Sequence, residues 1–328
     1  MPPIKYPRPT GHNLLPPQVL RPKSHEYVRI VDVSVRDGLQ NERGFVPTEI
    51  KCELLDRLTR TGLEAIEATS FVSPKWVPQL ADARKVMGHI KRAHSASKIR
   101  FPVLVPNKGG LESARAAGAT EIAVFASASE GFSRKNINCS IEESLRRYKE
   151  VCLLALQYGM KVRGYVSCVI ACPYDGHTPP ENVLRVSQSL LDMGCFEISL
   201  GDTIGVGTPA TIGILLNYLL KTIPSHSLAG HFHDTYGQGV ANVVKALEMG
   251  IRTFDASVGG LGGCPFAKGA TGNVAMEDVL YCLHSMGFKT GVNLEMVADI
   301  GDWISKTLAR NNSSRCGTAL VNRRRAKL

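Results

Sequence analysis

The stretch Ser227-Leu228-Ala229-Gly230-His231-Phe232-His233-Asp234 combines a short apolar run with two histidines that are two residues apart. If this stretch is a strand, side chains at i and i+2 lie on the same side, so the imidazoles of His231 and His233 face one point. Two such imidazoles can bind a divalent cation such as zinc, iron, nickel or manganese. Surface histidines or hydrogen-bonded core histidines are the alternative, and the spacing alone does not separate the two interpretations.

The same strand-then-helix order recurs along the chain. Apolar residues at helical spacing follow each β-rich run, and no antiparallel hairpin signal interrupts the series. This order favours a (β/α)8 TIM barrel over an open doubly wound sheet, with a further helix at 294–308 outside the eightfold ring. We predict strands at 27–35, 64–69, 99–105, 121–126, 161–169, 196–200, 227–231 and 252–258, and helices at 50–58, 77–90, 111–117, 141–158, 181–193, 208–220, 240–249 and 276–286.

Composition limits the classes of partner. The chain has 328 residues, enough for one large barrel or two ordinary domains, and a formal net charge of +10. Most of that charge lies in the two ends, so the nearly neutral body argues against a nucleic-acid partner. No apolar run reaches the length of a membrane span, which argues against a membrane partner. We expect a TIM-barrel domain at 28–309, a disordered, basic, Pro-rich arm at 1–27 and a basic C-terminal tail at 310–328.

The ends and the cysteines bear on the compartment. Nine scattered cysteines, an odd number, suit reduced thiols. Seven prolines in residues 1–27 make that arm a poor mitochondrial presequence. The last residues, Ala326-Lys327-Leu328, resemble the Ser-Lys-Leu type of peroxisomal address. We therefore expect a mitochondrial matrix or peroxisomal protein, with the terminal tripeptide favouring the peroxisome and its import receptor as a partner.

In a TIM barrel the catalytic groups follow the C-terminal ends of the strands. Helix capping explains Ser127, Ser129 and Thr203 at such positions. It does not explain Glu67, because a carboxylate between Ile66 and Ala68 needs a partner. The polar residues that follow the predicted strands are Arg36, Asp37, Glu67, Asn107, Ser127, Ser129, Ser167, Asp202, Thr203, His231, His233, Asp234 and Asn273.

Asp37, His231, His233 and Asn273 offer two imidazoles and two oxygens. This mixed set suits a six-coordinate ion with open positions, so Mg²⁺ or Mn²⁺ fits better than structural zinc. Arg36 stands next to Asp37, and a guanidinium beside a cation would stabilise an enolate oxygen.

Three cysteines carry alternatives. Cys168 and Cys172 have C-x3-C spacing, but without a second Cys or His pair nearby we expect core packing and loop structure rather than zinc binding. Cys264 follows a loop with four glycines in residues 259–263, which would let it approach the site as an acid or base. An inert thiol is the alternative for Cys264. The loop lacks the pattern of a dinucleotide fingerprint.

Several stretches together resemble the 3-hydroxy-3-methylglutaryl-coenzyme A (HMG-CoA) lyase family, and the resemblance runs from about Val28 to Leu308. The Arg-Asp-Gly and His-x-His elements are shared with other metal-dependent barrel lyases, aldolases and acyl-CoA condensing enzymes. The run Phe71–Gln79 and the Gly-Leu-Gly-Gly-Cys-Pro loop are more specific to the lyases. The matching stretches are 35–42, 69–79, 135–140, 201–208 and 257–273.

The resemblance implies cleavage of HMG-CoA to acetyl-CoA and acetoacetate, a step of leucine degradation and ketone-body formation. It implies metal ligation by the four residues named above and an acyl-CoA substrate. A homodimer is a separate expectation, because the sequence does not give the oligomeric state. The residues that it implies for catalysis are Arg36, Glu67, Asp202, His233 and Cys264, and those expected to bind substrate are Arg36, Gln40 and Ser73. One departure is Gly259, where the family usually has alanine.

Two other functions compete with the lyase. A condensing enzyme or aldolase could use the same metal and arginine on another acyl-CoA or keto acid, but such condensing enzymes often carry a sizeable C-terminal regulatory domain, and only about 20 residues follow the last predicted helix here. A catalytically silent barrel that binds a partner through its basic ends would be expected to have lost ligands, yet every polar position matches.

Overall fold

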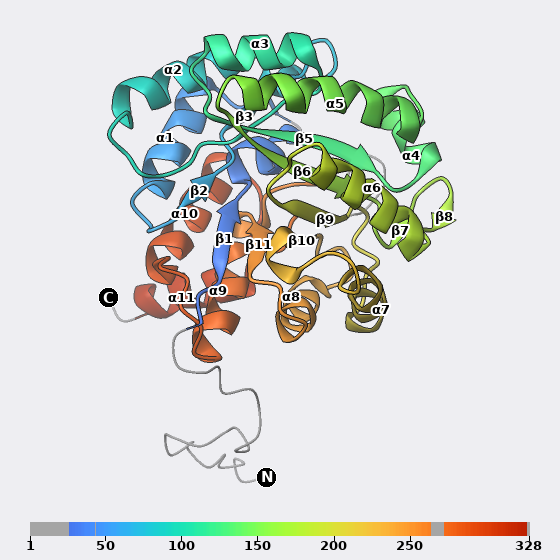
Figure 1. Cartoon of the computed structure of the whole chain (residues 1–328). Helices are drawn as coiled ribbons and strands as arrows, with labels where there is room; N and C mark the ends of the chain where they lie inside the picture. Colours follow the sequence, from blue (N-terminus) through green and yellow to red (C-terminus); the bar gives the residue numbers. More distant parts are fainter. Residues whose placement is uncertain (1–25, 43, 264–271, 327–328) are drawn as a thin grey trace.

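Parallel strands form a sheet that curls on itself, with helices on its outer side, in the computed structural model, which describes residues 26–42, 44–263 and 272–326 (Figure 1). The hydrogen-bonded order of the strands is β2-β1-β11-β10-β9-β6-β5-β4-β3. These strands are β1 (Arg29–Asp32), β2 (Ala65–Ile66), β3 (Thr69–Ser70), β4 (Val103–Leu104), β5 (Glu121–Ser127), β6 (Lys161–Ser167), β9 (Ile198–Asp202), β10 (Leu228–Phe232) and β11 (Thr253–Ala256).

The barrel closes through β2 and β3, which are two pieces of the second predicted strand. β2 pairs with β1, and β3 pairs with β4. Between them the Glu67 amide donates to the Asp32 carbonyl at 2.8 Å, and the Ala68 amide donates to the Pro102 carbonyl at 2.9 Å. One segment thus joins both edges of the sheet. The fold is an α/β barrel, and the TIM-barrel prediction is confirmed.

Each of the eight predicted helices has a counterpart, and the predicted extra helix is α10. Short helical turns are η1 (Ser34–Gly38), η2 (Pro78–Leu80), η3 (Ser225–Ser227) and η4 (Val258–Gly260). The α-helices are α1 (Thr48–Leu58), α2 (Ala83–Ala93), α3 (Lys108–Ala116), α4 (Glu130–Ile137), α5 (Ile141–Gln157), α6 (Pro180–Asp192), α7 (Pro209–Leu219), α8 (Gly239–Glu248), α9 (Met276–Ser285), α10 (Leu294–Thr307) and α11 (Arg315–Arg325).

Helix α4 and the hairpin formed by β7 (Ala171–Cys172) and β8 (Gly176–His177) were not predicted. Ser129 caps helix α4, because its hydroxyl accepts from the Phe132 amide at 3.2 Å. Few residues of this helix are apolar, so its sequence has little helical periodicity. The strands β7 and β8 form an antiparallel hairpin, so the expectation of no hairpin was wrong here. Strands of two residues are too short to alternate, which is why the sequence did not reveal them.

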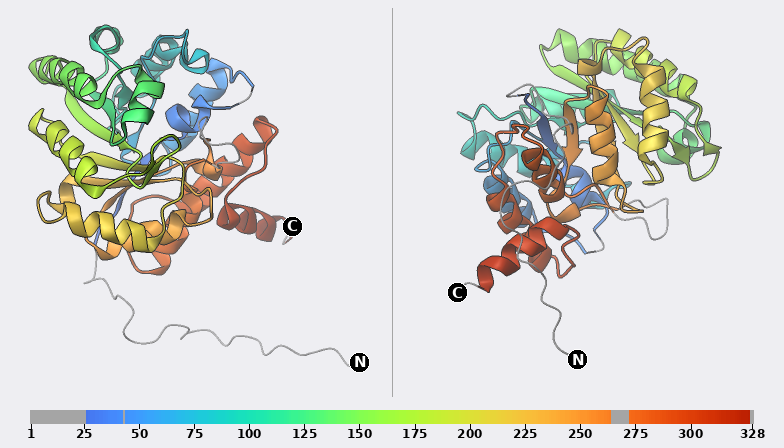
Figure 2. Two further views of the ribbon diagram at one scale, coloured as in Figure 1. Left: turned by 90° about the vertical axis from the view of Figure 1, so that its right-hand side faces the viewer. Right: turned by 90° about the horizontal axis from the view of Figure 1, so that it is seen from below.

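The basic C-terminal segment, expected as a tail, contains helix α11. Figure 2 shows α10 and α11, in red, lying together beside the barrel. Ser314 caps α11 by accepting from the Gly317 amide at 2.8 Å and also donates to Asp278 Oδ1 at 2.8 Å. Arg324 pairs with Glu295 at 2.5 Å and with Asp299. The acids of α10 therefore neutralise part of the charge that looked like a free basic run.

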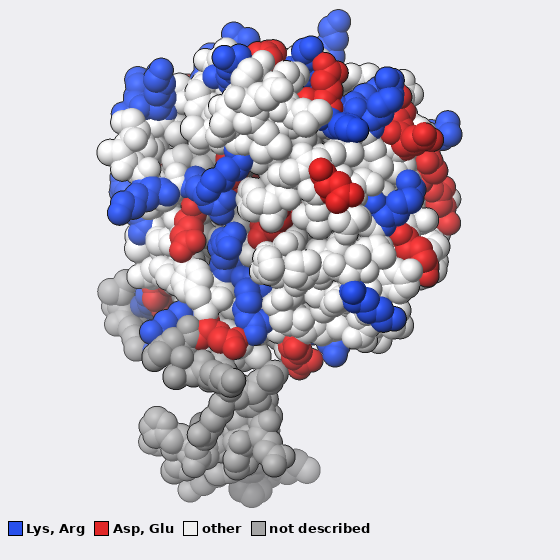
Figure 3. All heavy atoms as spheres, viewed as in Figure 1, with Lys and Arg blue, Asp and Glu red and all other residues white. Residues whose placement is uncertain are grey.

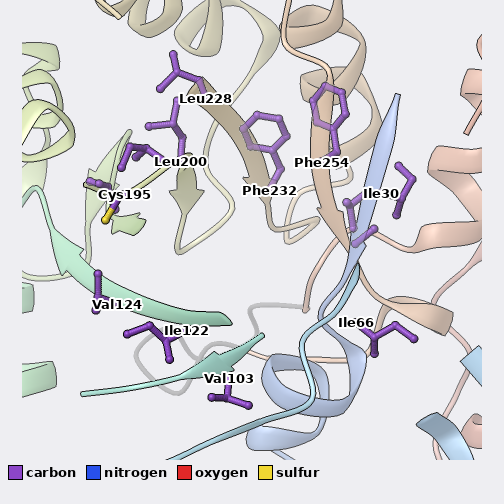
Figure 4. Close-up of a cluster of buried hydrophobic side chains, with 14 of the residues drawn as sticks. Ile30, Ile66, Val103, Ile122, Val124, Cys195, Leu200, Leu228, Phe232 and Phe254 are labelled. Carbon is purple, nitrogen blue, oxygen red and sulfur yellow. The ribbon is translucent and has the colours of Figure 1, made fainter. Parts of the chain in front are cut away.

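The hydrophobic core lies mainly between the strands and the helices. Figure 4 shows Leu200, Leu228, Phe232 and Phe254, from three neighbouring strands, in this layer. Inside the barrel the apolar contacts are limited to small clusters, such as Val31 with Val33 and Ala65. Many other inward positions of the described strands hold polar and charged side chains, which build the site described below.

The surface carries both signs of charge. On the face that Figure 3 presents, lysines and arginines are interspersed with acids rather than gathered into one basic field. No α-helix among the described residues is long and apolar enough to cross a membrane.

Candidate active site

Three predicted metal ligands come together at the C-terminal ends of the strands. One ligand atom each from Asp37, His231 and His233 lies within 4.8 Å of the others. Asn273 joins them, because its Nδ2 donates to Asp37 Oδ2 at 2.8 Å and its backbone forms a bridge to His233. The four side chains come from η1, from β10 and its end, and from the segment after the glycine loop. The sequence separates them by up to 236 positions.

The turn η1 fixes the place of Arg36 and Asp37. It is a π-helical turn in which the Gly38 amide donates to the Val33 carbonyl at 2.9 Å. A Cβ on Gly38 would lie 2.8 Å from the Leu261 Cβ, so only glycine lets this turn approach the glycine loop. Ser34 links the same two segments, since its hydroxyl accepts from the Val258 amide at 2.9 Å.

The two histidines have different surroundings. His231 Nδ1 lies 3.1 Å from Asp255 Oδ2, and its Nε2 lies 3.9 Å from Asp37 Oδ2. His233 Nδ1 is buried without a hydrogen-bond partner among the described residues. Burial and the neighbouring His231 lower the pKa of His233 to about 4. A neutral imidazole with an unshared lone pair, beside a carboxylate and a second imidazole, fits a divalent cation.

Arg36 is held between two carboxylates. Its Nε and Nη2 lie 2.7 and 2.6 Å from Glu67 Oε2, and its Nη1 lies 2.6 Å from Asp37 Oδ1. Burial alone would lower the pKa of Arg36, but the charges of Glu67 and Asp37 raise it. The predicted need of Glu67 for a partner is met by this contact, and Glu67 Oε1 stays buried and unpaired among the described residues. The guanidinium is therefore a fixed, permanent cation next to the metal-ligand cluster.

A buried network inside the barrel supports His231 and the pair of Arg36 and Glu67, and this network was not predicted from the sequence. Arg163 donates from Nη2 to Asp255 Oδ1 at 2.8 Å and from Nε to Glu197 Oε1 at 2.9 Å. Tyr165 accepts from Arg163 Nη1 at 3.0 Å and donates to Glu67 Oε2 at 3.2 Å. Burial would raise the pKa of Asp255, but Arg163 and His231 lower it. Asp255 is thus an ionised acceptor that orients His231.

A signal for this network was present in the sequence. Asp255 stands between Phe254 and Ala256 in a strand, as Glu67 stands between Ile66 and Ala68. Arg163 alternates with apolar residues in β6 and is only 2% exposed. The argument that a charge within a buried strand needs a partner applies to these residues too, although it does not name the partner.

Asp202 lies at the end of β9, in register with Phe232, the residue between the two histidines. Its Oδ2 accepts from the Gly207 amide at 2.8 Å, whereas its Oδ1 is buried and unpaired among the described residues. Burial raises the pKa of Asp202 to about 6. The side chain is therefore a stronger base than an ordinary carboxylate.

The remaining predicted site residues are Gln40, Ser73 and Cys264. Gln40 is half-buried just after η1, and Ser73 is exposed in the loop after β3. Cys264 lies outside the described residues. The described part of its loop reaches Gly263, whose carbonyl accepts from Asn41 Nδ2 at 2.9 Å. The glycine loop therefore approaches the residue next to Gln40.

Several polar residues at strand ends have local roles instead. Ser129 and Asn107 cap helices α4 and α3. Ser127 accepts from the Ser129 amide at 3.1 Å, and Thr203 accepts from the Cys168 amide at 2.8 Å. The capping interpretation is therefore confirmed for Ser129, whereas Ser127 holds an amide of its own turn and Thr203 holds an amide of the segment after β6.

The family model described as HMGL-like matches residues 27–304. The chain belongs to this family. The protein named 3-hydroxy-3-methylglutaryl-CoA lyase, cytoplasmic, from Danio rerio is 55% identical over 301 residues, which cover 92% of this chain and 89% of that protein. Other relatives are named as mitochondrial lyases. The chain is an enzyme of the lyase class, as predicted, which favours the lyase over the condensing enzyme and the silent barrel.

Solved structures agree with this membership. The hydroxymethylglutaryl-CoA lyase of Pseudomonas aeruginosa has a TM-score of 0.87 and 49% sequence identity, and the match covers 90% of this chain and 98% of that one. An HMG-CoA lyase described as from Acenitobacter baumannii, in complex with coenzyme A and 3-methylmalate, has a TM-score of 0.84 and 34% identity and covers 89% of this chain and 95% of that one.

Proposed function

We propose that this chain cleaves HMG-CoA to acetyl-CoA and acetoacetate with a divalent cation bound by Asp37, His231, His233 and Asn273. The observation that carries the proposal is the fixed guanidinium of Arg36 next to two buried imidazoles and a carboxylate. This is the arrangement needed where negative charge develops on a thioester oxygen. The names of the relatives supply the substrate.

The reaction breaks one carbon–carbon bond and moves one proton. The 3-hydroxyl group loses its proton, C3 becomes the ketone carbon of acetoacetate, and the electron pair of the C2–C3 bond passes to the thioester. The resulting enolate takes a proton at C2 and becomes acetyl-CoA. We propose Asp202 as the group that takes the hydroxyl proton, because its Oδ1 is a buried acceptor with no partner among the described residues and burial raises its pKa to about 6.

The remaining residues hold charge in place. A bound Mg²⁺ or Mn²⁺ would act as a Lewis acid on the substrate oxygens. Arg36 stabilises the enolate oxygen, and Glu67 keeps the guanidinium oriented through its two contacts with Oε2. The oxygen and nitrogen donors of the site favour these ions over structural zinc.

The substrate is proposed to be an acyl-CoA, in line with the relative that has coenzyme A bound. Gln40 and Ser73 lie on the segments after β1 and β3, which we propose to contact the acyl-CoA. Cys264 is proposed to reach the site with the glycine loop and to exchange a proton with the substrate.

One assay tests the function. Acetoacetate release from HMG-CoA is measured before chelation, after chelation, and after adding back Mg²⁺ or Mn²⁺. We expect activity to disappear with the chelator and to return with either ion. The variant His233→Ala is assayed in the same way. We expect its turnover to be lower by orders of magnitude and its circular dichroism spectrum to be unchanged. Full activity in the metal-free protein would reject the metal-dependent mechanism.

Alkylation tests Cys264. In a Cys316→Ala background, thiol reagents should inactivate the enzyme, and substrate should slow the inactivation. Cys264→Ser should bind substrate nearly as well and turn over much more slowly, because a hydroxyl has a far higher pKa than a thiol. Resistance of the Cys316→Ala protein to alkylation would mean that Cys264 has no catalytic role.

The compartment and the assembly are also proposals. The relatives include cytoplasmic and mitochondrial lyases, so similarity alone does not assign one compartment. We propose import into peroxisomes through Ala326-Lys327-Leu328, and we expect a fluorescent fusion that ends in these residues to enter peroxisomes and a chain ending at Ala326 to stay out. The homodimer remains a prediction, which sedimentation analysis tests.

A further inference from the structure

A second cluster of metal-ligating residues lies on the outside of the barrel. Asp56 lies near the C-terminal end of α1, His89 lies on α2, and His94 is the C-cap residue of α2. One ligand atom from each lies within 4.8 Å of the others. The two helices pack side by side, as Figure 1 shows. Barrel helices run antiparallel to the strands, so this cluster is at the opposite end from the active site.

Both imidazoles point at one carboxylate oxygen. His89 Nε2 and His94 Nε2 lie 2.7 and 2.6 Å from Asp56 Oδ1. The imidazole rings are 5.8 Å apart and inclined by 69°, which directs two nitrogens from different directions toward the same point. His94 reaches this position because its backbone leaves the helix at φ −128°. The ring of Phe101, 6.0 Å away, packs against the His94 imidazole from another side.

The surroundings favour a cation. Hydrogen bonds from both histidines lower the pKa of Asp56 although burial opposes this, so the carboxylate is ionised. One turn before it on α1, burial and the carboxylates of Asp56, Asp82 and Glu49 raise the pKa of the Cys52 thiol, while Arg92 acts in the opposite sense. Three carboxylates and one guanidinium thus act on this thiol, while Lys51 pairs with Asp82 at 2.9 Å.

We propose that Asp56, His89 and His94 bind a divalent cation of the zinc class and so join α1 to α2. Two imidazoles and one carboxylate are ligands that zinc accepts in tetrahedral sites, and the three side chains are 34%, 23% and 15% exposed, so water can take the fourth position. Because this donor set is richer in nitrogen than in oxygen, it selects zinc, cobalt or nickel over magnesium.

Binding requires only small side-chain movements. With ligand bonds of about 2.1 Å and tetrahedral angles, the nitrogens and the oxygen would be separated by about 3.4 Å. The present separations of 2.7 and 2.6 Å must therefore widen by somewhat less than about 1 Å, which rotation of partly exposed side chains provides. A proton that lies between an imidazole nitrogen and Asp56 Oδ1 must leave that position when a metal binds there.

The number of zinc ions bound per chain tests the site. Zinc bound at the active site contributes equally to the wild type and to a variant of this cluster, so it cancels when the two numbers are subtracted. Zinc bound per chain is measured by equilibrium dialysis with Mg²⁺ in excess, in the wild-type protein and in the double variant His89→Gln, His94→Gln. We expect the double variant to bind one equivalent less. His226→Gln, which changes an exposed histidine on η3, is the matched control and should bind as the wild type does.

Three further measurements use the same proteins. Zinc should raise the thermal midpoint of the wild type and of His226→Gln more than that of the double variant. Only in the first two proteins can a bound ion join α1 to α2 and stabilise the folded state. Cobalt should give the absorption bands of a tetrahedral site that the double variant lacks. Acetoacetate release in Mg²⁺ should be the same in all three proteins, since the cluster is remote from the active site.

The single variant His89→Gln allows the proposal to be tested even if the double variant does not fold. It retains the contact between Asp56 and His94, and it should weaken zinc binding roughly tenfold or more while its circular dichroism spectrum is unchanged. Equal zinc stoichiometry and affinity in the wild type and the folded His89→Gln variant would overturn the proposal and identify the cluster as a hydrogen-bonded group without a metal.

Discussion

Arg36 illustrates how single residues of this site are held. Its side chain is only 7% exposed, and carboxylates contact it on two sides. The Tyr165 ring also lies 5.4 Å from the guanidinium and 5.1 Å from that of Arg163, so both arginines pack against the same ring. A cation fixed in this way needs little rearrangement when charge develops on a substrate oxygen, which is the condition for electrostatic catalysis.

Arg36→Gln should therefore lower kcat much more than it raises KM. The missing charge matters chiefly in the transition state, and a loss of roughly 100-fold to 1,000-fold in kcat is expected for one such group. Steady-state kinetics of acetoacetate release measures both constants. Glu67→Gln is the comparison, and it should cost less because the arginine charge remains. A loss confined to KM would make Arg36 a clamp for the ground-state substrate.

Glu277 is a buried carboxyl under the glycine loop. The Gly259 amide lies 2.9 Å from both of its oxygens. Burial raises the pKa of Glu277 from 4.5 to about 8. Between these two values the folded protein keeps a proton that the unfolded chain has lost. The free energy of unfolding should therefore fall as pH rises through this window, and Glu277 should add no further slope above about pH 8.

Glu277→Gln should remove this part of the pH dependence, because the amide keeps the shape and does not ionise. The expected difference in slope is at most about 1.4 kcal/mol per pH unit. Urea unfolding from pH 5.5 to 8.5 would measure it. Asp32, whose pKa burial raises to about 7, contributes to both proteins and cancels in the comparison. Parallel curves for the two proteins would contradict the prediction.

At the scale of elements, the base of the glycine loop depends on backbone conformation. Gly259 lies in η4 with φ 57°, and Gly260 follows with φ 62°. A Cβ on Gly259 would lie 3.2 Å from Ser305 Oγ and 3.3 Å from Asn312 Oδ1. Gly259 stands where the family usually has alanine. Because glycine has no Cβ, it adopts this left-handed conformation without steric strain. The contacts around it come from α10 and the segment before α11.

Gly259→Ala, which restores the usual residue of the family, should destabilise this chain by about 1–2 kcal/mol. The reason is the left-handed backbone, since the two contacting atoms belong to side chains that can move. Urea unfolding measures the change. Gly44→Ala is the matched control, because a Cβ there meets nothing within 4 Å and its φ is not in the left-handed region. Equal stability of Gly259→Ala and wild type would mean that the loop base relaxes.

The whole molecule is completed by α11, which packs on α9 and α10. Its capping residue Ser314 contacts Asp278, and a Cβ on Gly317 would lie 3.2 Å from Glu277 Oε1. The segment before it supports the site as well, since the Ser313 amide donates to the Gly259 carbonyl at 3.0 Å and Arg310 pairs with Glu42 at 2.6 Å. The C-terminal segment therefore covers the buried carboxyl beneath the loop.

A chain that ends at Ser314 should be less stable than the full chain by on the order of 2–3 kcal/mol, a shift of roughly 3–5 °C in the thermal midpoint for a chain of this length. Loss of α11 would expose Glu277 and remove the ion pairs to α10. Calorimetry measures the midpoint. A chain that ends at Ala326 is the control, and its thermal midpoint should equal that of the full chain. Equal midpoints for the two truncated chains would show that α11 contributes nothing to stability.

Local pattern determined much of this protein. Periods of two and of 3.6 residues predicted the strands and helices of the barrel because each element buries one face, and α5 at Ile141–Gln157 agrees with its predicted range at all but the last residue. The barrel rule placed Asp37, His231 and His233 at one end of the fold. A charged residue in an apolar strand, such as Glu67, could be recognised as needing a partner.

Only the tertiary structure determined which groups meet. Arg163 and Asp255 are 92 positions apart, and their contact depends on the register of β6 and β11 around a closed barrel. The break between β2 and β3 joins the two edges of the sheet, and the acids of α10 neutralise a segment that looked like a free basic tail. Periodicity records which face of an element is buried, whereas partners across the fold are set by closure and register, which no local pattern contains.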